Sequence, residues 1–362
     1  MRTMSSSTSS SDKRMDSDKR SWFSFCVTYG VSLAVIVIGL VGLIYVIDPY
    51  DTGRSRMFER EGVRPQGPRT AAPSRIRDPQ FNAAIIGNSK AQILSPQRLD
   101  ALSDLKFVQL TMPGTGPTEQ LAVLDWYLHN HPGTPEAVVL AMDPRWCGQE
   151  ASPAVLNPFP FWMFEKDRLT YTGELLRFNA LQEALTRISY LTSRNPKKAS
   201  ADGYWDYTDD YVLQGFGTKP EHIEHRERNV EETARHEPKT LPLLLPLNPT
   251  GRYPALEKLA AMSKSMAPAT ALIIYLPPVY YRGLPAENSA DGQQIAQCKG
   301  AIRQIITKAH AQTAVVDWWT DRPEVRKPEY FFDQLHYRNE LSALVEQDIA
   351  TAYRTLKEKQ SD

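Results

Sequence analysis

A serine and a distant aspartate–histidine pair have the residue types and spacing that suggest covalent chemistry. Ser89 ends an apolar run in Ile85-Ile86-Gly87-Asn88-Ser89-Lys90, in which the glycine permits a sharp turn at the exit of a strand. Such a turn presents a hydroxyl where a nucleophile is needed. If a helix begins at this point, its unpaired backbone N–H groups also stabilise an oxyanion. The alternative interpretation makes Ser89 the cap of that helix.

The second candidate piece lies near the carboxyl end, in Phe331-Phe332-Asp333-Gln334-Leu335-His336-Tyr337. An aspartate and a histidine three residues apart can share one turn. The carboxylate then accepts the imidazole Nδ1–H, and Nε2 faces a hydroxyl as a general base. The alternative is a helix start capped by Asp333, with His336 as an incidental residue of its first turn.

A third piece, Met112-Pro113-Gly114-Thr115-Gly116-Pro117, offers backbone donors. Gly114 can present its N–H to an oxyanion without obstruction by a side chain. Gly114 and Gly116 are equally explained as turn residues before a helix. The piece is therefore informative only in combination with Ser89, Asp333 and His336.

The framework that positions these pieces is an alternation of strands and helices. Five short apolar runs, each followed by a turn, have the length of buried strands: residues 83–86, 107–110, 138–142, 272–276 and 314–317. Helical patterns separate them, notably over residues 118–129 and 290–309. This alternation predicts an α/β fold with a doubly wound, flavodoxin-like parallel sheet, whose ligands bind at the carboxyl ends of the strands.

One domain over residues 81–355, with a short tail at 356–362, accounts for the remaining length. Residues 151–250 break the alternation and are predicted to form an inserted helical cap. Its aromatic residues could stack on sugar rings or form the core of the cap: Tyr204, Trp205, Tyr207 and Tyr211. Its histidines could gather around a metal or belong to a solvated helix face: His222, His225 and His236.

Residues 22–47 carry no charged side chain and are long enough to cross a hydrocarbon core, which needs ~20 apolar residues. The segment runs directly into Asp48 and Pro49 without a small-residue cleavage site, so it is predicted to be an uncleaved anchor in the lipid bilayer. The Ser-rich residues 1–21 are predicted to be a disordered tail, and residues 48–80, rich in Arg, Pro and Gly, to be a linker.

Flanking cations predict the orientation of this anchor. The tail before it carries Arg2, Lys13, Arg14, Lys19 and Arg20. Because cationic flanks favour the cytoplasmic side, we expect a cytoplasmic amino terminus in the inner membrane and a periplasmic main domain. Four arginines after the span reduce this contrast: Arg54, Arg56, Arg60 and Arg64.

The overall charge and the cysteine count exclude some classes of partner. With 42 basic and 42 acidic residues the chain has no net charge, which disfavours nucleic acid as a partner. Cys26 lies in the span, so only Cys147 and Cys298 could form a disulfide in the main domain, and two free thiols are at least as well supported by the sequence. No CxxC motif or Cys/His cluster suggests zinc, and no metal or other cofactor is expected.

In their order and placement, the three pieces resemble the SGNH hydrolase superfamily over residues 80–350. The chain is most similar to the membrane-anchored branch related to cell-envelope polysaccharide O-acetylation proteins. The resemblance implies that Ser89 is the nucleophile, His336 the general base, and Asp333 the group that orients it. It also implies that the backbone N–H groups of Ser89 and Gly114 are oxyanion donors.

Two positions depart from the family pattern. Asn88 replaces the aspartate of the usual Gly-Asp-Ser opening, and Asp143 follows the third strand where the family supplies an asparagine to the oxyanion hole. A carboxylate at Asp143 repels an oxyanion, so it must point elsewhere, be protonated, or pair with Arg145. Asn88, Asp143 and Arg145 are candidate substrate-binding residues.

Two further residues are candidates for substrate binding. Lys90 either attracts an acidic or phosphorylated acceptor or is a solvated lysine at the edge of a cleft. Tyr280 or Tyr281, after the fourth predicted strand, could line the substrate groove.

The resemblance implies a serine esterase or O-acyltransferase that acts on envelope glycans. A polysaccharide would be the acceptor, and a multi-span membrane protein would donate the acyl group. The rival hypothesis is a non-catalytic envelope protein that binds glycan or scaffolds an assembly in the same cleft.

Overall fold

The computed structural model describes residues 9–58, 60, 62–149, 158–206, 208, 230, 248 and 250–361. Its centre is a five-stranded parallel sheet with strand order β2-β1-β3-β4-β5. The strands are β1 (Ala83–Ile86), β2 (Phe107–Gln109), β3 (Ala137–Ala141), β4 (Ala271–Leu276) and β5 (Thr313–Asp317). This is the doubly wound order, so the predicted fold class is confirmed. Each strand end lies within one residue of its predicted position.

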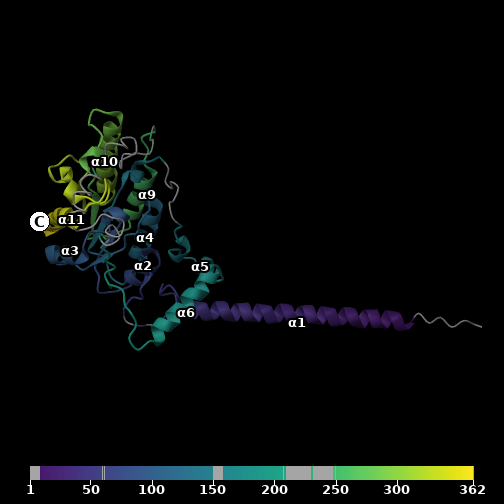
Figure 1. Ribbon diagram of the computed structural model, residues 1–362. Helices are drawn as coiled ribbons and strands as arrows, with labels where there is room; N and C mark the ends of the chain where they lie inside the picture. Colours follow the sequence, from purple (N-terminus) through teal and green to yellow (C-terminus); the bar gives the residue numbers. More distant parts are fainter. Residues whose placement is uncertain are drawn as a thin grey trace, which may run out of the picture.

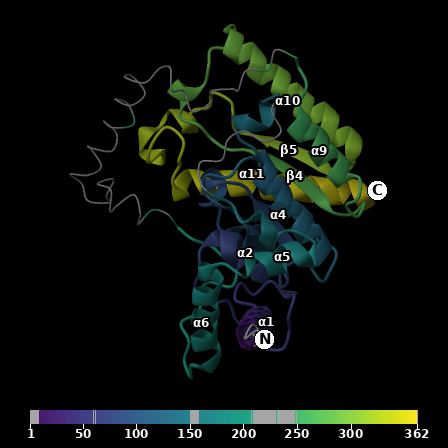
Figure 2. The ribbon, with the colours of Figure 1, turned by 90° about the vertical axis from the view of Figure 1, so that its right-hand side faces the viewer.

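Both faces of the sheet are buried, as a parallel sheet requires. In β3, Val138 and Leu140 enter one core and Ala137 and Val139 enter the other, because side chains alternate along a strand. The first core is covered by α2 (Pro68–Ile76), α4 (Pro117–Asn130), α9 (Pro254–Ser263) and α10 (Ala290–Ala309). The second is covered by α3 (Pro96–Ser103) and α11 (Asn339–Ser361). Figure 2 shows β4 and β5 running between α9 and α10 on one side and α11 on the other.

The two predicted helices match closely. The helix predicted at residues 290–309 is α10, capped by Ser289, whose hydroxyl accepts the Gly292 N–H. The helix predicted at residues 118–129 is α4, which is one residue longer at each end.

The tail predicted at residues 356–362 is wrong, because α11 continues to Ser361 and Leu356 is buried against the second core. An amphipathic helix ends where its apolar face stops packing, and Leu356 still belongs to that face.

Helix α1 (Ser9–Ile47) projects from the domain (Figure 1), and its Lys19–Ile47 part is long and apolar enough to cross a membrane. The helix already begins at Ser9, so the prediction of a disordered tail over residues 1–21 is wrong from that residue on. The last turn of α1 enters the domain, where Ile44 and Ile47 are buried in the first core.

The predicted linker at residues 48–80 is in fact a packed junction. Asp48 folds back on the chain: its carboxylate accepts the Thr52 N–H at 3.0 Å and the Gly53 N–H at 2.7 Å, and it also accepts the hydroxyl of Tyr171 at 3.1 Å. Asp51 binds Arg77 and Arg187, each at 3.1 Å. Helix α2 then buries Ile76 in the first core. Polar and charged groups hold this segment, which is why it shows no apolar periodicity.

The described part of the predicted cap contains α5 (Arg168–Glu174) and α6 (Phe178–Thr192). Both lie beside the end of α1 (Figure 1), and α6 contacts α1. Tyr204 is partly buried and Trp205 is exposed. Tyr207, Tyr211, His222, His225 and His236 lie outside the described residues.

A disulfide joins Cys147, at the end of the 3-10 turn η2 (Pro144–Cys147) after β3, to Cys298 in α10. The bond connects positions 151 residues apart in the sequence. It therefore ties the loop after β3 to the helix that precedes β5. Cys26 in α1 is a free, exposed thiol.

Candidate functional site

Ser89 lies at the carboxyl end of β1, as the first residue of the short 3-10 turn η1 (Ser89–Ala91). Gly87 is needed there for space, since a β-carbon on it would lie 2.7 Å from the β-carbon of Ala141 in β3. The α-helix considered at this point does not form, and α3 begins only at Pro96. Asn88, not Ser89, is the capping residue, because its Oδ1 accepts the Lys90 N–H at 3.1 Å.

His336 reaches Ser89 from the loop between β5 and α11. The distance from His336 Nε2 to Ser89 Oγ is 2.9 Å, and His336 Nδ1 lies 2.8 Å from Asp333 Oδ2. A carboxylate can only accept, so Nδ1 carries the proton and Nε2 accepts from the serine hydroxyl. The structure thus brings together three side chains in the order hydroxyl, imidazole, carboxylate.

The same aspartate also shapes the loop. Asp333 Oδ1 accepts the backbone N–H groups of Leu335 at 2.7 Å and His336 at 2.8 Å. This resembles the capping considered as an alternative, but the turn does not continue as a helix, since α11 starts at Asn339. Burial alone raises the pKa of Asp333, but the neighbouring His336 and these hydrogen bonds outweigh it and hold the pKa below the ordinary value of an aspartate. The carboxylate is therefore charged near neutral pH.

Aromatic packing fixes the ends of the loop. Phe331, Phe332 and Tyr337 are fully buried in the second core, and Phe331 pairs with Tyr337 in an antiparallel bridge. The Tyr337 hydroxyl lies 2.8 Å from that of Tyr275 in β4. Because the residues on both sides of Asp333 and His336 are anchored, the imidazole is held in place before any substrate arrives.

The two departures from the family pattern contact each other. Asn88 Nδ2 donates to Asp143 Oδ2 at 2.8 Å. Arg145 also binds Asp143, with Nε at 2.8 Å and Nη2 at 2.5 Å from the same oxygen. Of the three options considered for Asp143, the structure has the pairing with Arg145. The amide and the guanidinium compensate the buried carboxylate.

Thr115 closes this network, and the sequence contained no signal for it. Its backbone carbonyl accepts Arg145 Nη2 at 2.5 Å and faces Asn88 Nδ2 at 3.5 Å. Gly114, just before it, has φ of 75°, a left-handed conformation that favours glycine. The loops after β1, β2 and β3 are thus joined at one edge of the sheet, next to Ser89.

Four of the predicted substrate-binding residues are buried: Lys90 and Tyr280, in addition to Asn88 and Asp143. Tyr280 is fully buried in the second core, where its ring packs against Phe331 at 5.5 Å between centroids, so it does not line a groove. Its neighbour Tyr281 is partly exposed. Lys90 is buried, which excludes the solvated lysine. Burial lowers the pKa of its ammonium, and the charge of Asp143 opposes that shift.

Among the described residues, no group of three or more His, Cys, Asp or Glu side chains could hold a metal ion.

No family model matches the chain, and no curated protein matches it. Among solved structures, a protein described as a gut microbial diltiazem-metabolizing enzyme is similar, with 11% identity and a TM-score of 0.32. The similarity covers 82% of this chain and 48% of that protein, so the chain spans about half its length. At this level the likeness supports no functional argument.

Proposed function

We propose that this protein is a membrane-anchored serine acyl esterase or O-acyltransferase of the SGNH type that acts on cell-envelope glycans. The observation that carries the proposal is the contact of 2.9 Å between Ser89 Oγ and His336 Nε2, with Asp333 behind the imidazole. Residues 247 positions apart in the sequence meet in this contact. A chance contact between such distant residues is not expected to place a hydroxyl, an imidazole and a carboxylate in the order of a catalytic triad.

In the proposed reaction Ser89 Oγ attacks the carbonyl carbon of an ester, and His336 Nε2 takes the hydroxyl proton. The carbonyl oxygen becomes an oxyanion, stabilised by the backbone N–H groups of Ser89 and Gly114. When the intermediate collapses, the bond to the leaving alcohol breaks and His336 returns the proton to that alcohol. The acyl group then remains on Ser89.

The second half of the reaction repeats these roles with another alcohol or with water. His336 takes a proton from the incoming hydroxyl, which attacks the acyl carbon and releases Ser89. Water as acceptor gives an esterase, and a sugar hydroxyl gives a transferase. Asp333 stays ionised and stabilises the imidazolium that forms in each half. A periplasmic domain on an anchor suits a polysaccharide acceptor and an acyl donor supplied by a multi-span membrane partner.

One observation favours the rival, a non-catalytic glycan-binding protein. Asp143 and its partners occupy the place where the family supplies an oxyanion amide, and the loss of one such donor can cost ~100-fold in rate. Labelling with a fluorophosphonate distinguishes the two, because it reports an activated serine without requiring the natural substrate.

We expect the wild-type protein to be labelled and Ser89→Ala to remain unlabelled. His336→Ala should reduce the labelling rate at least ~100-fold, because the hydroxyl loses its base. Ser74→Ala, in α2, is a matched control that should be labelled like the wild type. Equal labelling of wild type and Ser89→Ala would remove Ser89 from the mechanism.

A further inference from the structure

Exposed apolar side chains gather on α5, α6 and the turn between them. Leu169 is 82% exposed, Phe178 77%, and Leu176 and Leu185 are each 62% exposed. With Ile188 they form what we call the α5–α6 surface. Outside α1, the other large apolar side chains exposed among the described residues are Met57, Phe58 and Trp205. A group of exposed apolar side chains of this kind marks a surface that binds a protein, a ligand or a membrane.

The pattern of α6 shows that the domain covers only part of its apolar side. Ala180, Ala184 and Tyr190 are buried. A second stripe lies beside them at helical spacing and faces outward: Phe178, Leu185 and Ile188. Leu181, in the same stripe, is partly buried against the first core. The remaining face is polar and holds Asn179, Gln182, Thr186 and Ser189. Such a helix, with its apolar arc left open, is typical of helices that lie in a membrane interface.

The exposure of α1 indicates the level of the bilayer. Apart from the partly exposed Val41, its apolar side chains are exposed from residue 22 to residue 43, a length of roughly 33 Å at ~1.5 Å per residue, close to the ~30 Å hydrocarbon core. Ile44 and Ile47 are then covered by the domain. The ring of Tyr45 packs against that of Tyr171 in α5 at 6.1 Å between centroids. Helix α5 therefore lies where α1 would leave the hydrocarbon.

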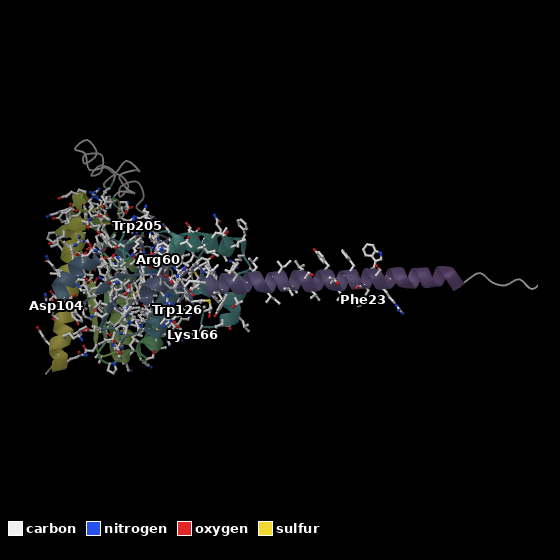
Figure 3. All side chains as sticks on the ribbon, turned by 90° about the horizontal axis from the view of Figure 1, so that it is seen from below. Phe23, Arg60, Asp104, Trp126, Lys166 and Trp205 are labelled. Carbon is white, nitrogen blue, oxygen red and sulfur yellow. A yellow bond between two sulfur atoms is a disulfide. The ribbon has the colours of Figure 1, made fainter. Side chains whose placement is uncertain are left out.

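The views agree with this placement. Figure 1 shows α5 and α6 beside the domain end of α1. In Figure 3, Phe23 lies on the projecting part of α1, Lys166 on the side of the domain next to it, and Asp104 at the opposite end.

The packed junction holds α6 next to the point where α1 would leave the hydrocarbon core. Arg187 of α6 binds Asp51 at 3.1 Å, and Glu183 of α6 binds Arg64 at 2.5 Å. Both partners, Arg64 and Asp51, lie in the packed junction that follows α1. From these contacts we infer that the α5–α6 surface is inserted in the outer interface of the lipid bilayer and seats the domain on the membrane. This inference depends on the proposed membrane anchoring of α1.

The charges around the α5–α6 surface indicate whether apolar or electrostatic attraction would bind it to the bilayer. Cations and anions alternate in equal number along residues 165–177: Glu165, Lys166, Asp167, Arg168, Glu174 and Arg177. Arg54 and Arg60 also lie beside the two helices, but they donate to backbone carbonyl groups of the protein, among them those of Met163 and Tyr190. The contact is therefore apolar rather than electrostatic, and it needs no anionic lipid. We expect the same seating in vesicles of zwitterionic phosphatidylcholine and little change with salt.

Site-directed spin labelling of the full chain in phosphatidylcholine vesicles tests the inference. In a Cys26→Ser background, Leu176→Cys, Phe178→Cys or Leu185→Cys carries the label, and the Cys147–Cys298 disulfide stays intact. Thr186→Cys, on the polar face of the same helix, and Ala101→Cys, near Asp104, are matched controls. We expect the ratio of oxygen to nickel-chelate accessibility to be severalfold higher at the three apolar positions than at the controls.

A label on the native Cys26, which is exposed in α1, tests the membrane anchoring of α1 separately from the insertion of the α5–α6 surface. Lipid exposure at Cys26 together with water exposure at Phe178 and Leu185 would overturn the seating and leave the anchor intact. Water exposure at Cys26 would overturn both. Labels at the α5–α6 surface that are shielded from oxygen and nickel alike would show a protein on that surface and would also overturn the inference.

Discussion

The side chains around Ser89 form a charge pattern that is reversed relative to the family they resemble. There, an aspartate precedes the serine and an asparagine follows the third strand. Here the amide is Asn88 and the carboxylate is Asp143, and the two are hydrogen-bonded at 2.8 Å. Exchanging both residues preserves an amide that donates to a carboxylate, whereas changing Asn88 alone to aspartate leaves two carboxylates face to face. The two departures are therefore one coupled change.

This coupling predicts the behaviour of Asn88→Asp. Two carboxylates at this distance cannot both ionise without cost, so we expect a loss of about 2 kcal/mol in unfolding free energy and at least ~10-fold slower fluorophosphonate labelling. The double variant Asn88→Asp/Asp143→Asn should recover most of the stability, because it restores an amide–carboxylate pair. Chemical denaturation of the four proteins in the cycle measures the coupling. Additive losses in the double variant would contradict it.

Residue type and spacing were enough to select Ser89, Asp333 and His336 as partners, because their chemistry needs a particular order of groups. They were not enough to assign Tyr280 and Lys90, which are buried. A side chain that follows a strand can point to the ligand edge or turn back into a core, and only tertiary packing decides between them. The carbonyl of Thr115 was missed because any residue could supply it.

At the scale of elements, α11 holds the preceding loop, which carries His336, against the sheet. Glu346, fully buried in α11, forms an ion pair with Arg98 of α3, with Nε at 2.5 Å and Nη2 at 2.8 Å from its two oxygens. It also accepts the Ser95 N–H at 2.7 Å and the Ser342 hydroxyl at 3.0 Å. The two helices on this face of the sheet are thus joined through the carboxylate of Glu346, ten residues after His336.

We expect Glu346→Ala to lower the unfolding free energy by about 2 kcal/mol, because the buried Ser95 N–H loses its acceptor and the half-exposed Arg98 guanidinium keeps only its bond to Asn339. Thermal or chemical unfolding measures this loss. Glu358→Ala, at an exposed position of the same helix, should change stability by less than ~0.5 kcal/mol. Equal effects of the two substitutions would show that the ion pair does not hold α11.

The sheet was predictable at the level of elements and the junction was not, for a physical reason. Strands buried on both faces appear in the sequence as continuous apolar runs. The junction is held instead by buried polar groups such as Asp48, Arg64 and Arg75. Some of their partners lie far away in the sequence, as Glu183 does for Arg64 and Tyr171 for Asp48, so no local pattern marks the segment as packed. Charged residues in a Pro- and Gly-rich stretch then resemble a linker.

For the whole molecule, the packed junction and the disulfide act on the same core. Ile44 and Ile47 of α1, Cys147 after β3 and Cys298 of α10 belong to one buried cluster. The apolar helix is thus a continuation of the domain rather than a tether, which would keep Ser89 at a constant height above the bilayer. A disulfide persists in oxidising compartments, so this bond supports the proposed periplasmic placement of the domain.

Placement and stability can be tested together through the cysteines. If the domain lies in the periplasm, a thiol reagent applied to membranes from cells should modify Cys147 and Cys298 only after reduction, and a reporter phosphatase fused after residue 362 should be active. The bond closes a loop of 151 residues, so Cys147→Ser/Cys298→Ser should lower the unfolding free energy by about 2–4 kcal/mol. Cys26→Ser, outside this loop, should leave it unchanged. Free thiols at both positions together with an inactive phosphatase would place the domain in the cytoplasm, where a chain with this junction would need another acyl acceptor.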